Sequence, residues 1–180
     1  NTIASLIRFN PKQAEQAVED LADMFRASFS DTRQLVTWHE ELTLCLQYSR
    51  IEALRFGERL QMVWQTDKIP EDALLPPLCL QPLLENAIRH GIQSLPEGGT
   101  IDINGQFDGK FISLEITNPI AEEWPSPHQG NQMAQTNIQQ RLQVYYGAQA
   151  YLRVQHQNQR YQVALRFPYK NQYNENYCRR

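Results

Sequence analysis

Beyond residue 57 the sequence alternates between the two hydrophobic periods that distinguish strands from helices. Apolar and polar side chains alternate over residues 58–65, and this two-residue period returns over residues 100–107 and 111–118. Asp108-Gly109 lies between the last two segments, and this dipeptide favours the tight turn of a β-hairpin. The sequence therefore predicts a strand followed later by a hairpin.

Helical patterns separate these strands. Residues 80–93 and 133–146 have the 3.6-residue period of amphipathic helices, and two further strands are predicted over residues 150–156 and 161–168. A loop rich in Pro, Gln and Gly spans residues 119–132. The order strand, helix, hairpin, loop, helix and two strands predicts an α/β fold, a two-layer sandwich in which helices cover one face of a mixed sheet.

A helical segment precedes this alternation. Residues 1–9 are typical of the end of a helix that Asn10-Pro11 breaks, and residues 12–29 predict a second helix. Apolar or small residues recur along it at alternating spacings of four and three, which predicts pairing with other helices. These seam residues are Ala14, Val18, Leu21, Phe25 and Ser28.

A third helix follows a loop over residues 30–36. Thr37 and Glu40 stand three residues apart, as the N-cap and N3 positions of a capping box do. This helix is predicted to end near Phe56-Gly57, because glycine tolerates the left-handed conformation that terminates helices.

Composition narrows the class of protein. The 180 residues have a net charge of −3, with 41% hydrophobic and 21% charged residues, which is typical of one soluble globular domain. Clustered Lys and Arg are missing, so no direct contact with nucleic acid is expected. Cys45, Cys79 and Cys178 fit neither a disulfide framework nor a zinc pattern, which favours a reducing compartment. No transmembrane segment is visible, and because the chain starts at Asn1 we expect a fragment.

The helix over residues 80–93 has two chemically different sides. On a helical projection one side is apolar, and it contains Leu80, Leu83, Leu84, Ala87, Ile88 and Gly91. The other side contains Pro82, Glu85, Asn86, Arg89, His90 and Gln93. One interpretation is a solvated surface helix with a Glu85–Arg89 pair worth a few tenths of a kcal/mol. The long loop downstream favours the other interpretation, a ligand site, because such loops in compact domains often serve binding.

The motif P-L-C-L-Q-P-L-L-E-N-A-I-R-H-G-I (77–92) resembles the N-box of the histidine-kinase ATP-binding domain. It is most similar to that of sensor kinases of the LytS and AlgZ/FimS type. Upstream, N-T-I-A-S-L-I resembles the segment after their phosphoacceptor motif, and A-V-E-D-L-A-D-M-F-R-A-S resembles their second dimerisation helix. Downstream, G-N-Q-M-A-Q-T-N-I-Q-Q-R-L resembles their lid and the helix after it. The resemblance covers about residues 1–169.

The resemblance implies the GHKL (Bergerat) ATP-binding fold, which is shared with gyrase B and MutL. It divides the chain into a remnant of the helical dimerisation region (1–35), a connecting helix (36–57) and an ATP-binding domain (58–170). The last residues (171–180) lack periodicity and are expected to form a disordered tail.

The same resemblance implies a site for ATP and Mg²⁺. It assigns Asn86 to the Mg²⁺ that bridges the phosphates, and Arg89 with His90 to the phosphates themselves. Mg²⁺ binds few protein oxygens beside phosphate and water, and a guanidinium pairs with phosphate oxygens, so these residue types fit. Further ATP-binding positions carry over to Asn118, Gly130 and Asn137.

Several positions depart from the family pattern. Asn118 replaces the adenine-binding Asp, Gln132 and Ala134 replace lid glycines, and Tyr161 replaces an adenine-side Thr. A nucleotide-free pseudokinase scaffold that acts by protein contact therefore remains an alternative. A gyrase-like ATPase is a second one, but Pro82 stands where that class has its water-activating Glu.

The resemblance implies a sensor histidine kinase that passes the γ-phosphoryl group of ATP to a His upstream of Asn1. His39 is a weaker candidate for this role, because it lies in the first turn of the predicted connecting helix; His128 and His156 have no motif around them. The implied partners are a response regulator, of the LytTR type, and a second copy of the chain. The family further implies a membrane anchor outside this sequence, with the kinase at the cytoplasmic face of the bacterial inner membrane, whereas the fragment itself is expected to be soluble.

Overall fold

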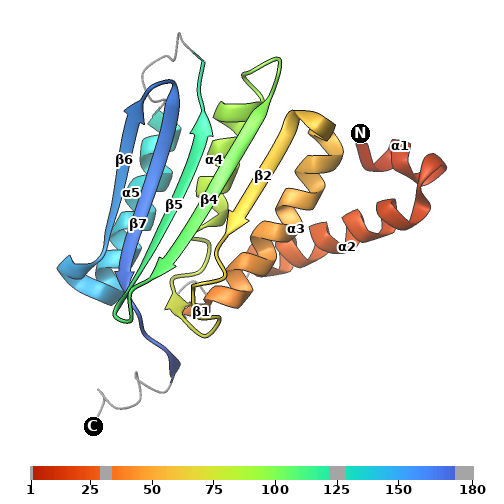
Figure 1. Ribbon diagram of the computed structural model, residues 1–180. Helices are drawn as coiled ribbons and strands as arrows, with labels where there is room; N and C mark the ends of the chain where they lie inside the picture. Colours follow the sequence, from red (N-terminus) through yellow and green to blue (C-terminus); the bar gives the residue numbers. More distant parts are fainter. Residues whose placement is uncertain (1, 29–33, 122–128, 173–180) are drawn as a thin grey trace.

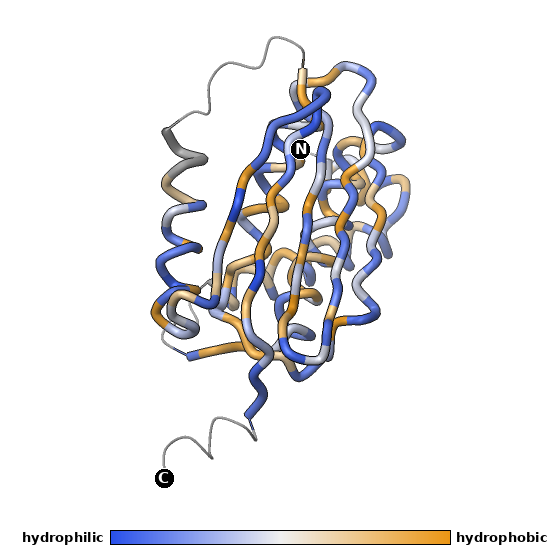
Figure 2. The backbone as a smooth tube through the Cα atoms, turned by 60° about the vertical axis from the view of Figure 1, so that its left-hand side comes forward, coloured by the Kyte–Doolittle hydropathy of each residue, from blue (hydrophilic) through white to orange (hydrophobic). Residues whose placement is uncertain are grey.

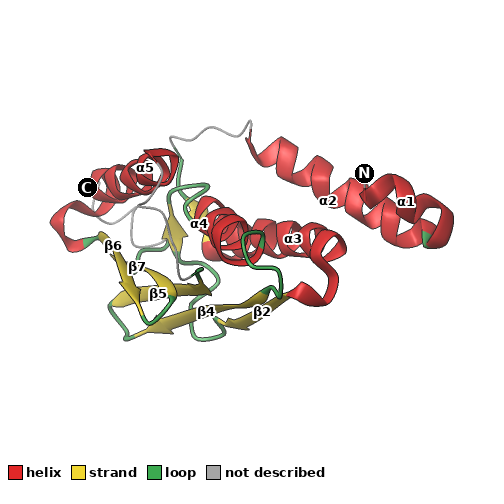
Figure 3. Ribbon diagram, turned by 90° about the horizontal axis from the view of Figure 1, so that it is seen from above, coloured by secondary structure: helices red, strands yellow, loops and turns green. Residues whose placement is uncertain are grey.

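The protein folds as a mixed sheet with a layer of helices on one face (Figures 1 and 3). The computed structural model describes residues 2–28, 34–121 and 129–172. The five-stranded sheet has the order β2-β4-β5-β7-β6, in which β2 and β4 are parallel and all other neighbours are antiparallel. Its strands are β2 (Leu60–Gln65), β4 (Gly99–Phe107), β5 (Phe111–Pro119), β6 (Tyr151–Gln157) and β7 (Arg160–Pro168). The predicted two-layer sandwich is confirmed.

Three helices cover the sheet, and two more precede them. Seen from above, α4 lies between α3 and α5, while α1 and α2 extend away from the sheet beside α3 (Figure 3). The helices are α1 (Thr2–Phe9), α2 (Pro11–Ser28), α3 (Trp38–Phe56), α4 (Gln81–Ala87) and α5 (Gln129–Tyr146). Short 3₁₀ turns η1 (Gly57–Arg59) and η3 (Gly147–Gln149) and a π-helical turn η2 (Ile88–Ile92) complete them.

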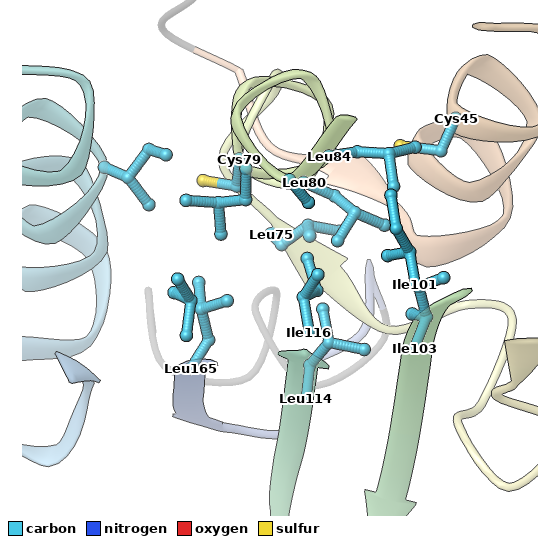
Figure 4. Close-up of a cluster of buried hydrophobic side chains, with 14 of the residues drawn as sticks. Cys45, Leu75, Cys79, Leu80, Leu84, Ile101, Ile103, Leu114, Ile116 and Leu165 are labelled. Carbon is cyan, nitrogen blue, oxygen red and sulfur yellow. The ribbon is translucent and has the colours of Figure 1, made fainter. Parts of the chain in front are cut away.

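The core fills the space between sheet and helices. Strand residues alternate in hydropathy along the chain (Figure 2), and one face of each of the three central strands β4, β5 and β7 is buried under the helices. Cys45, Cys79 and Leu84 come from the helical side and meet Ile101, Leu114 and their strand neighbours (Figure 4). Because α3 contributes Trp38 and Cys45 to this core, it packs as part of the same unit as the sheet.

Apart from shifts of one residue and from the helix over residues 80–93, the elements differ from the sequence prediction in three places. β2 begins at Leu60 because residues 57–59 form a 3₁₀ turn, and α5 begins at Gln129, four residues earlier than predicted. The short strands β1 (Val36–Thr37) and β3 (Leu74–Leu75) were not predicted, because two residues are too few to show a period. They pair with each other and join the segment before α3 to the segment before α4.

The helix predicted over residues 80–93 is only partly α-helical. It is α-helical to Ala87 and then widens into the π-helical turn Ile88–Ile92, in which the N–H of Gln93 donates to the carbonyl of Ile88 at 2.9 Å. Single π-helical turns are rare and often occur at functional sites. The predicted apolar side is buried as expected.

The predicted seam of α2 faces away from the domain. Ala14 is buried, but Val18, Leu21 and Phe25 are each more than half exposed. The buried face of α2 consists instead of Ala14, Ala17 and Asp20. Val18, Leu21 and Phe25 therefore form an exposed apolar stripe in a single chain, whereas the side chain of Ser28 lies outside the described part of the structure. Among the helices of the described residues, none combines the length and hydropathy that a membrane span requires.

Candidate functional site: the polar face of α4

The helix that carries the N-box residues is positioned by its buried face. Leu83, Leu84 and Ala87 of α4 and Ile88 of the π-helical turn are almost fully buried. Burying such aliphatic side chains stabilises the fold by roughly 1.5–3 kcal/mol each, so the rotation of this helix is determined by the core. The opposite side, with Asn86 and Arg89, is thereby directed outward.

Asn86 and Arg89 line one small cavity between α4 and α3. The cavity has a volume of about 180 Å³, and its wall is polar. Its lining consists of Tyr48, Glu52, Arg55, Glu85, Asn86, Ile88, Arg89 and Gln93. Sequence analysis did not assign the contribution from α3, because no local signal places α3 beside the N-box helix.

The amide nitrogen of Asn86 is buried and has no hydrogen-bond partner. An unpaired buried amide costs free energy, roughly 1–3 kcal/mol, unless a ligand or water satisfies it. Rotation about the terminal side-chain torsion lets this residue present its nitrogen to a phosphate oxygen or its oxygen to Mg²⁺. The residue type and its unsatisfied state therefore fit a site for a magnesium-bound nucleotide.

The cavity is electrostatically mixed. Glu52 forms an ion pair with Arg55 at 3.5 Å and is 12% exposed. Burial raises the pKa of the Glu52 carboxyl above its ordinary value; Arg55 opposes this shift, and the nearby charge of Glu85 adds to it. Two neighbouring carboxylates would be stabilised by a cation bound in the cavity.

The predicted Glu85–Arg89 ion pair does not form. Glu85 instead accepts a hydrogen bond from Gln81 at 2.9 Å, one turn towards the start of the helix. The change from α-helical to π-helical geometry at Ile88 rotates Arg89 relative to Glu85, which removes the i,i+4 geometry that the pair requires. Arg89 is exposed on the face of the helix that lines the cavity.

Asn118 lies at the end of β5, beneath the π-helical turn. It is 1% exposed, and its amide nitrogen donates to the carbonyl of Pro119 at 2.7 Å. This bond leaves the amide oxygen as the acceptor that a base amino group would need. Gly91 packs directly on it, since a Cβ at this glycine would lie 2.6 Å from the Asn118 nitrogen.

Tyr161 is adjacent to Asn118 across the sheet. The two residues are paired in the β5–β7 register, and the Tyr161 hydroxyl accepts a hydrogen bond from Gln135 of α5. The His156 ring packs edge-on against the Tyr161 ring at a centroid distance of 4.7 Å. The residue that replaces the family's Thr is therefore buried, and it links the sheet to α5.

The remaining predicted residues lie elsewhere. Asn137 is exposed on α5 and lines a different groove, of about 640 Å³, which includes Leu78 and Pro82. His90 is half-buried in the π-helical turn. Gly130 belongs to the first turn of α5, whose surroundings lie outside the described residues, as does His128. The structure thus brings Asn86 and Arg89 together but places Asn137 apart from them.

Other sequence expectations concern cysteine and histidine residues. Cys45 and Cys79 are buried free thiols, and Cys178 lies outside the described residues with most of the predicted tail. His39 is exposed in the first turn of α3, as expected. No cluster of three His, Cys, Asp or Glu side chains within residues 2–28, 34–121 and 129–172 could hold a metal ion.

The fold and the site define a class: the GHKL-type ATP-binding fold of histidine-kinase catalytic domains. The catalytic domain of histidine kinase ThkA superimposes with a TM-score of 0.51 at 15% identity, covering 75% of this chain and 95% of that one. At this identity the likeness shows the fold alone.

Sequence comparisons agree with this class. A histidine kinase family model matches residues 1–60. The sensor histidine kinase BtsS of Escherichia coli K12 is 29% identical over 173 residues, which are 96% of this chain and 31% of BtsS. The sensor protein LytS of Streptococcus agalactiae is 31% identical over 160 residues, which are 82% of this chain and 27% of LytS. The chain is thus a relative of the LytS-type sensor histidine kinases, as its motifs indicated, and spans about a third of the length of these relatives.

Proposed function

We propose that this chain is the ATP-binding catalytic portion of a sensor histidine kinase. Asn86 would ligate the Mg²⁺ that bridges the nucleotide phosphates, and Arg89 and His90 would contact the phosphates. The observation that carries this proposal is the buried, unpaired amide of Asn86 beside the guanidinium of Arg89. Positioning and charge neutralisation are the main protein contributions to phosphoryl transfer, and these residues supply both.

The acceptor of the phosphoryl group would be a His outside this sequence. From there the group would pass to an Asp of a response regulator, of the LytTR type by the family's association. The stripe of Val18, Leu21 and Phe25 supports dimerisation through α2 in the whole protein, because each of these apolar side chains is more than half exposed in a single chain. The membrane anchor at the cytoplasmic face of the inner membrane is likewise proposed for the whole protein.

Binding of a non-hydrolysable ATP analogue with Mg²⁺, measured by calorimetry, tests the proposal. We expect micromolar to sub-millimolar affinity, and loss of binding in Asn86→Ala. Asn104→Ala is the matched control, because this asparagine lies on the strand β4 and lines no part of the cavity. Equal affinity of both variants would contradict the role of Asn86.

One observation favours the alternative scaffold function. Tyr161 replaces the smaller Thr of the family beside Asn118, and its hydroxyl is already bonded to Gln135. A bulky, satisfied side chain at this position can occupy space that the base requires. The absence of binding heat, with circular dichroism showing an intact fold, would favour the scaffold. Steady release of phosphate from ATP without a His acceptor would instead favour a gyrase-like ATPase.

A further inference from the structure

The first turn of α4 has no side-chain cap of its own. Leu80 occupies the N-cap position and cannot accept a hydrogen bond from the exposed N–H groups of the helix. A buried carboxylate from another helix instead binds the segment that leads into α4. Glu41 of α3, only 1% exposed, accepts from the N–H of Leu78, from that of Cys79 at 3.1 Å and from that of Leu80 at 2.9 Å.

The same segment is held from its other side by a cation. Arg141 of α5 donates to the carbonyl of Pro77 at 2.6 Å and to that of Leu78 at 2.9 Å. Leu78 has a φ of +55°, a conformation that costs a branched aliphatic residue free energy and persists only where its surroundings enforce it. Glu41 and Arg141 bind the N–H and the carbonyl of this strained residue, so they are the groups that enforce it.

Electrostatics show what maintains this arrangement. Burial raises the pKa of the Glu41 carboxyl, whereas the three backbone N–H donors and the charge of Arg141 oppose the shift. The positive end of the α4 dipole also favours a carboxylate here. A buried charge with this many directed partners contributes little net stability, so its function is better explained by the geometry it imposes.

The far end of the same helix is fixed by similar contacts. Arg59 of η1 donates to the carbonyl of Ile92 at 3.3 Å and to that of Leu95 at 2.7 Å, where the π-helical turn ends. Side chains from three other elements thus hold α4 and its π-helical extension at both ends. Axial position and rotation of Asn86 both depend on these contacts.

We propose that Glu41 and Arg141 are positioning residues of the nucleotide site. By fixing residues 77–80 they set the position of α4 along its axis and its rotation about that axis, and therefore where the Asn86 side chain meets the ligand. Because Arg141 belongs to α5, they also join that helix to the N-box helix as one unit. This inference rests on the function proposed above and assigns a role to two residues that lie outside its ligand-binding set.

Glu41→Gln tests the proposal, with Glu58→Gln as the matched control, since Glu58 is exposed on η1. The glutamine keeps the shape but directs an N–H₂ group at backbone N–H donors. We expect affinity for the magnesium-bound ATP analogue to fall about tenfold, the usual scale for residues that orient a ligand-binding group. The control is expected to bind as the unsubstituted chain does.

A second readout needs no nucleotide. The side-chain amide NMR resonances of Asn86 are expected to shift in Glu41→Gln but not in Glu58→Gln. The spectra are recorded at a temperature well below the unfolding midpoint of each variant. Alkylation of Cys79, whose N–H is bound by Glu41, is expected to accelerate relative to that of Cys45, as read by peptide mass mapping. A general loss of packing would accelerate both thiols equally and would count against positioning.

Arg141→Lys provides an independent test if Glu41→Gln does not fold. Lysine keeps the charge but cannot bind the two carbonyls in the forked geometry of arginine, so weaker nucleotide binding and shifted Asn86 resonances are again expected. Arg153→Lys is its control. Unchanged affinity together with unchanged Asn86 resonances in the folded variants would overturn the inference. If the unsubstituted chain binds no nucleotide, the proposed function fails, whereas the resonance and alkylation results still decide whether Glu41 and Arg141 position Asn86.

Discussion

Gly91 shows how a single residue connects the N-box helix to the sheet. Its φ does not require glycine, but its surroundings do, because a Cβ would lie 2.6 Å from the Asn118 amide nitrogen and 2.9 Å from the Pro119 carbonyl oxygen. The absent side chain lets the π-helical turn approach the end of β5. Asn118, proposed for the base side of the nucleotide, and the π-helical turn with Arg89 and His90, proposed for the phosphates, are thereby held close together.

Gly91→Ala is therefore expected to destabilise the fold by about 1–3 kcal/mol, as overpacking of a tight contact does. The free energy of unfolding in urea measures this, and nucleotide affinity should fall because Asn118 must move. Gly109→Ala is the comparison: Gly109 has a φ of +90° in an open turn, so its substitution strains the backbone without touching the site. If Gly109→Ala also lowers affinity, the effect of Gly91 is not specific to its contact with Asn118.

At the scale of elements, α3 has a larger role than that of a connector. Its first turn has the predicted capping box: the Thr37 side chain accepts from the Glu40 N–H at 3.2 Å, and the Glu40 carboxylate accepts from the Thr37 N–H at 2.7 Å. The turn that this box stabilises also carries Glu41. The predicted boundary between a connecting helix (36–57) and the ATP-binding domain (58–170) stays a prediction, although α3 shares the core of the sheet.

Thr37→Ala should lower the free energy of unfolding by about 1 kcal/mol, the usual effect of losing an N-cap side chain. Chemical denaturation measures the difference. Thr37→Ser keeps the hydroxyl and is expected to retain most of the stability. Equal stability of the alanine and serine variants would show that the hydrogen bonds of the box contribute nothing measurable.

At the scale of the whole molecule, the two helices that precede α3, α1 and α2, are attached to it by polar contacts of α2. Asp20, 2% exposed, accepts from Arg50 at 2.9 and 2.7 Å, and Gln47 donates to Asp23 at 2.9 Å. The buried apolar side chains of α2 are small, namely Ala14 and Ala17. Separation of the two parts should therefore be easier than unfolding of either the sheet or its helices.

Arg50→Ala is expected to loosen α2 more than Asp20→Ala does. Removing the half-exposed arginine leaves a buried carboxylate without its cationic partner, whereas removing the aspartate leaves an arginine that can turn to water. Trypsin cleavage after Lys12 and Arg26 of α2 should accelerate several-fold, while the denaturant midpoint of the sheet domain stays nearly constant. Equal cleavage rates in both variants would contradict this asymmetry.

Local patterns determined much of what was predicted. The hairpin around Asp108-Gly109, the pair β6–β7, the capping box at Thr37 and the two sides of the N-box helix follow from periodicity and turn chemistry within a few residues. The Asn86–Arg89 pairing on one face follows from helical geometry in the same way. Such features could be predicted because their causes lie next to one another in the sequence.

Only the tertiary structure decided the remainder. The parallel pairing of β2 with β4, the β1–β3 pair, the π-helical turn and the exposed seam of α2 depend on contacts between distant segments. The clearest case is Glu41, which sequence analysis did not single out. Its carboxylate is directed at N–H groups 37 to 39 residues further along the chain, and no local pattern encodes that distance. The sequence by itself thus determined which side chains form the polar side of the N-box helix, and the packing of α3, α4 and α5 decided how they are held, because burial and backbone hydrogen bonding are satisfied only in the assembled fold.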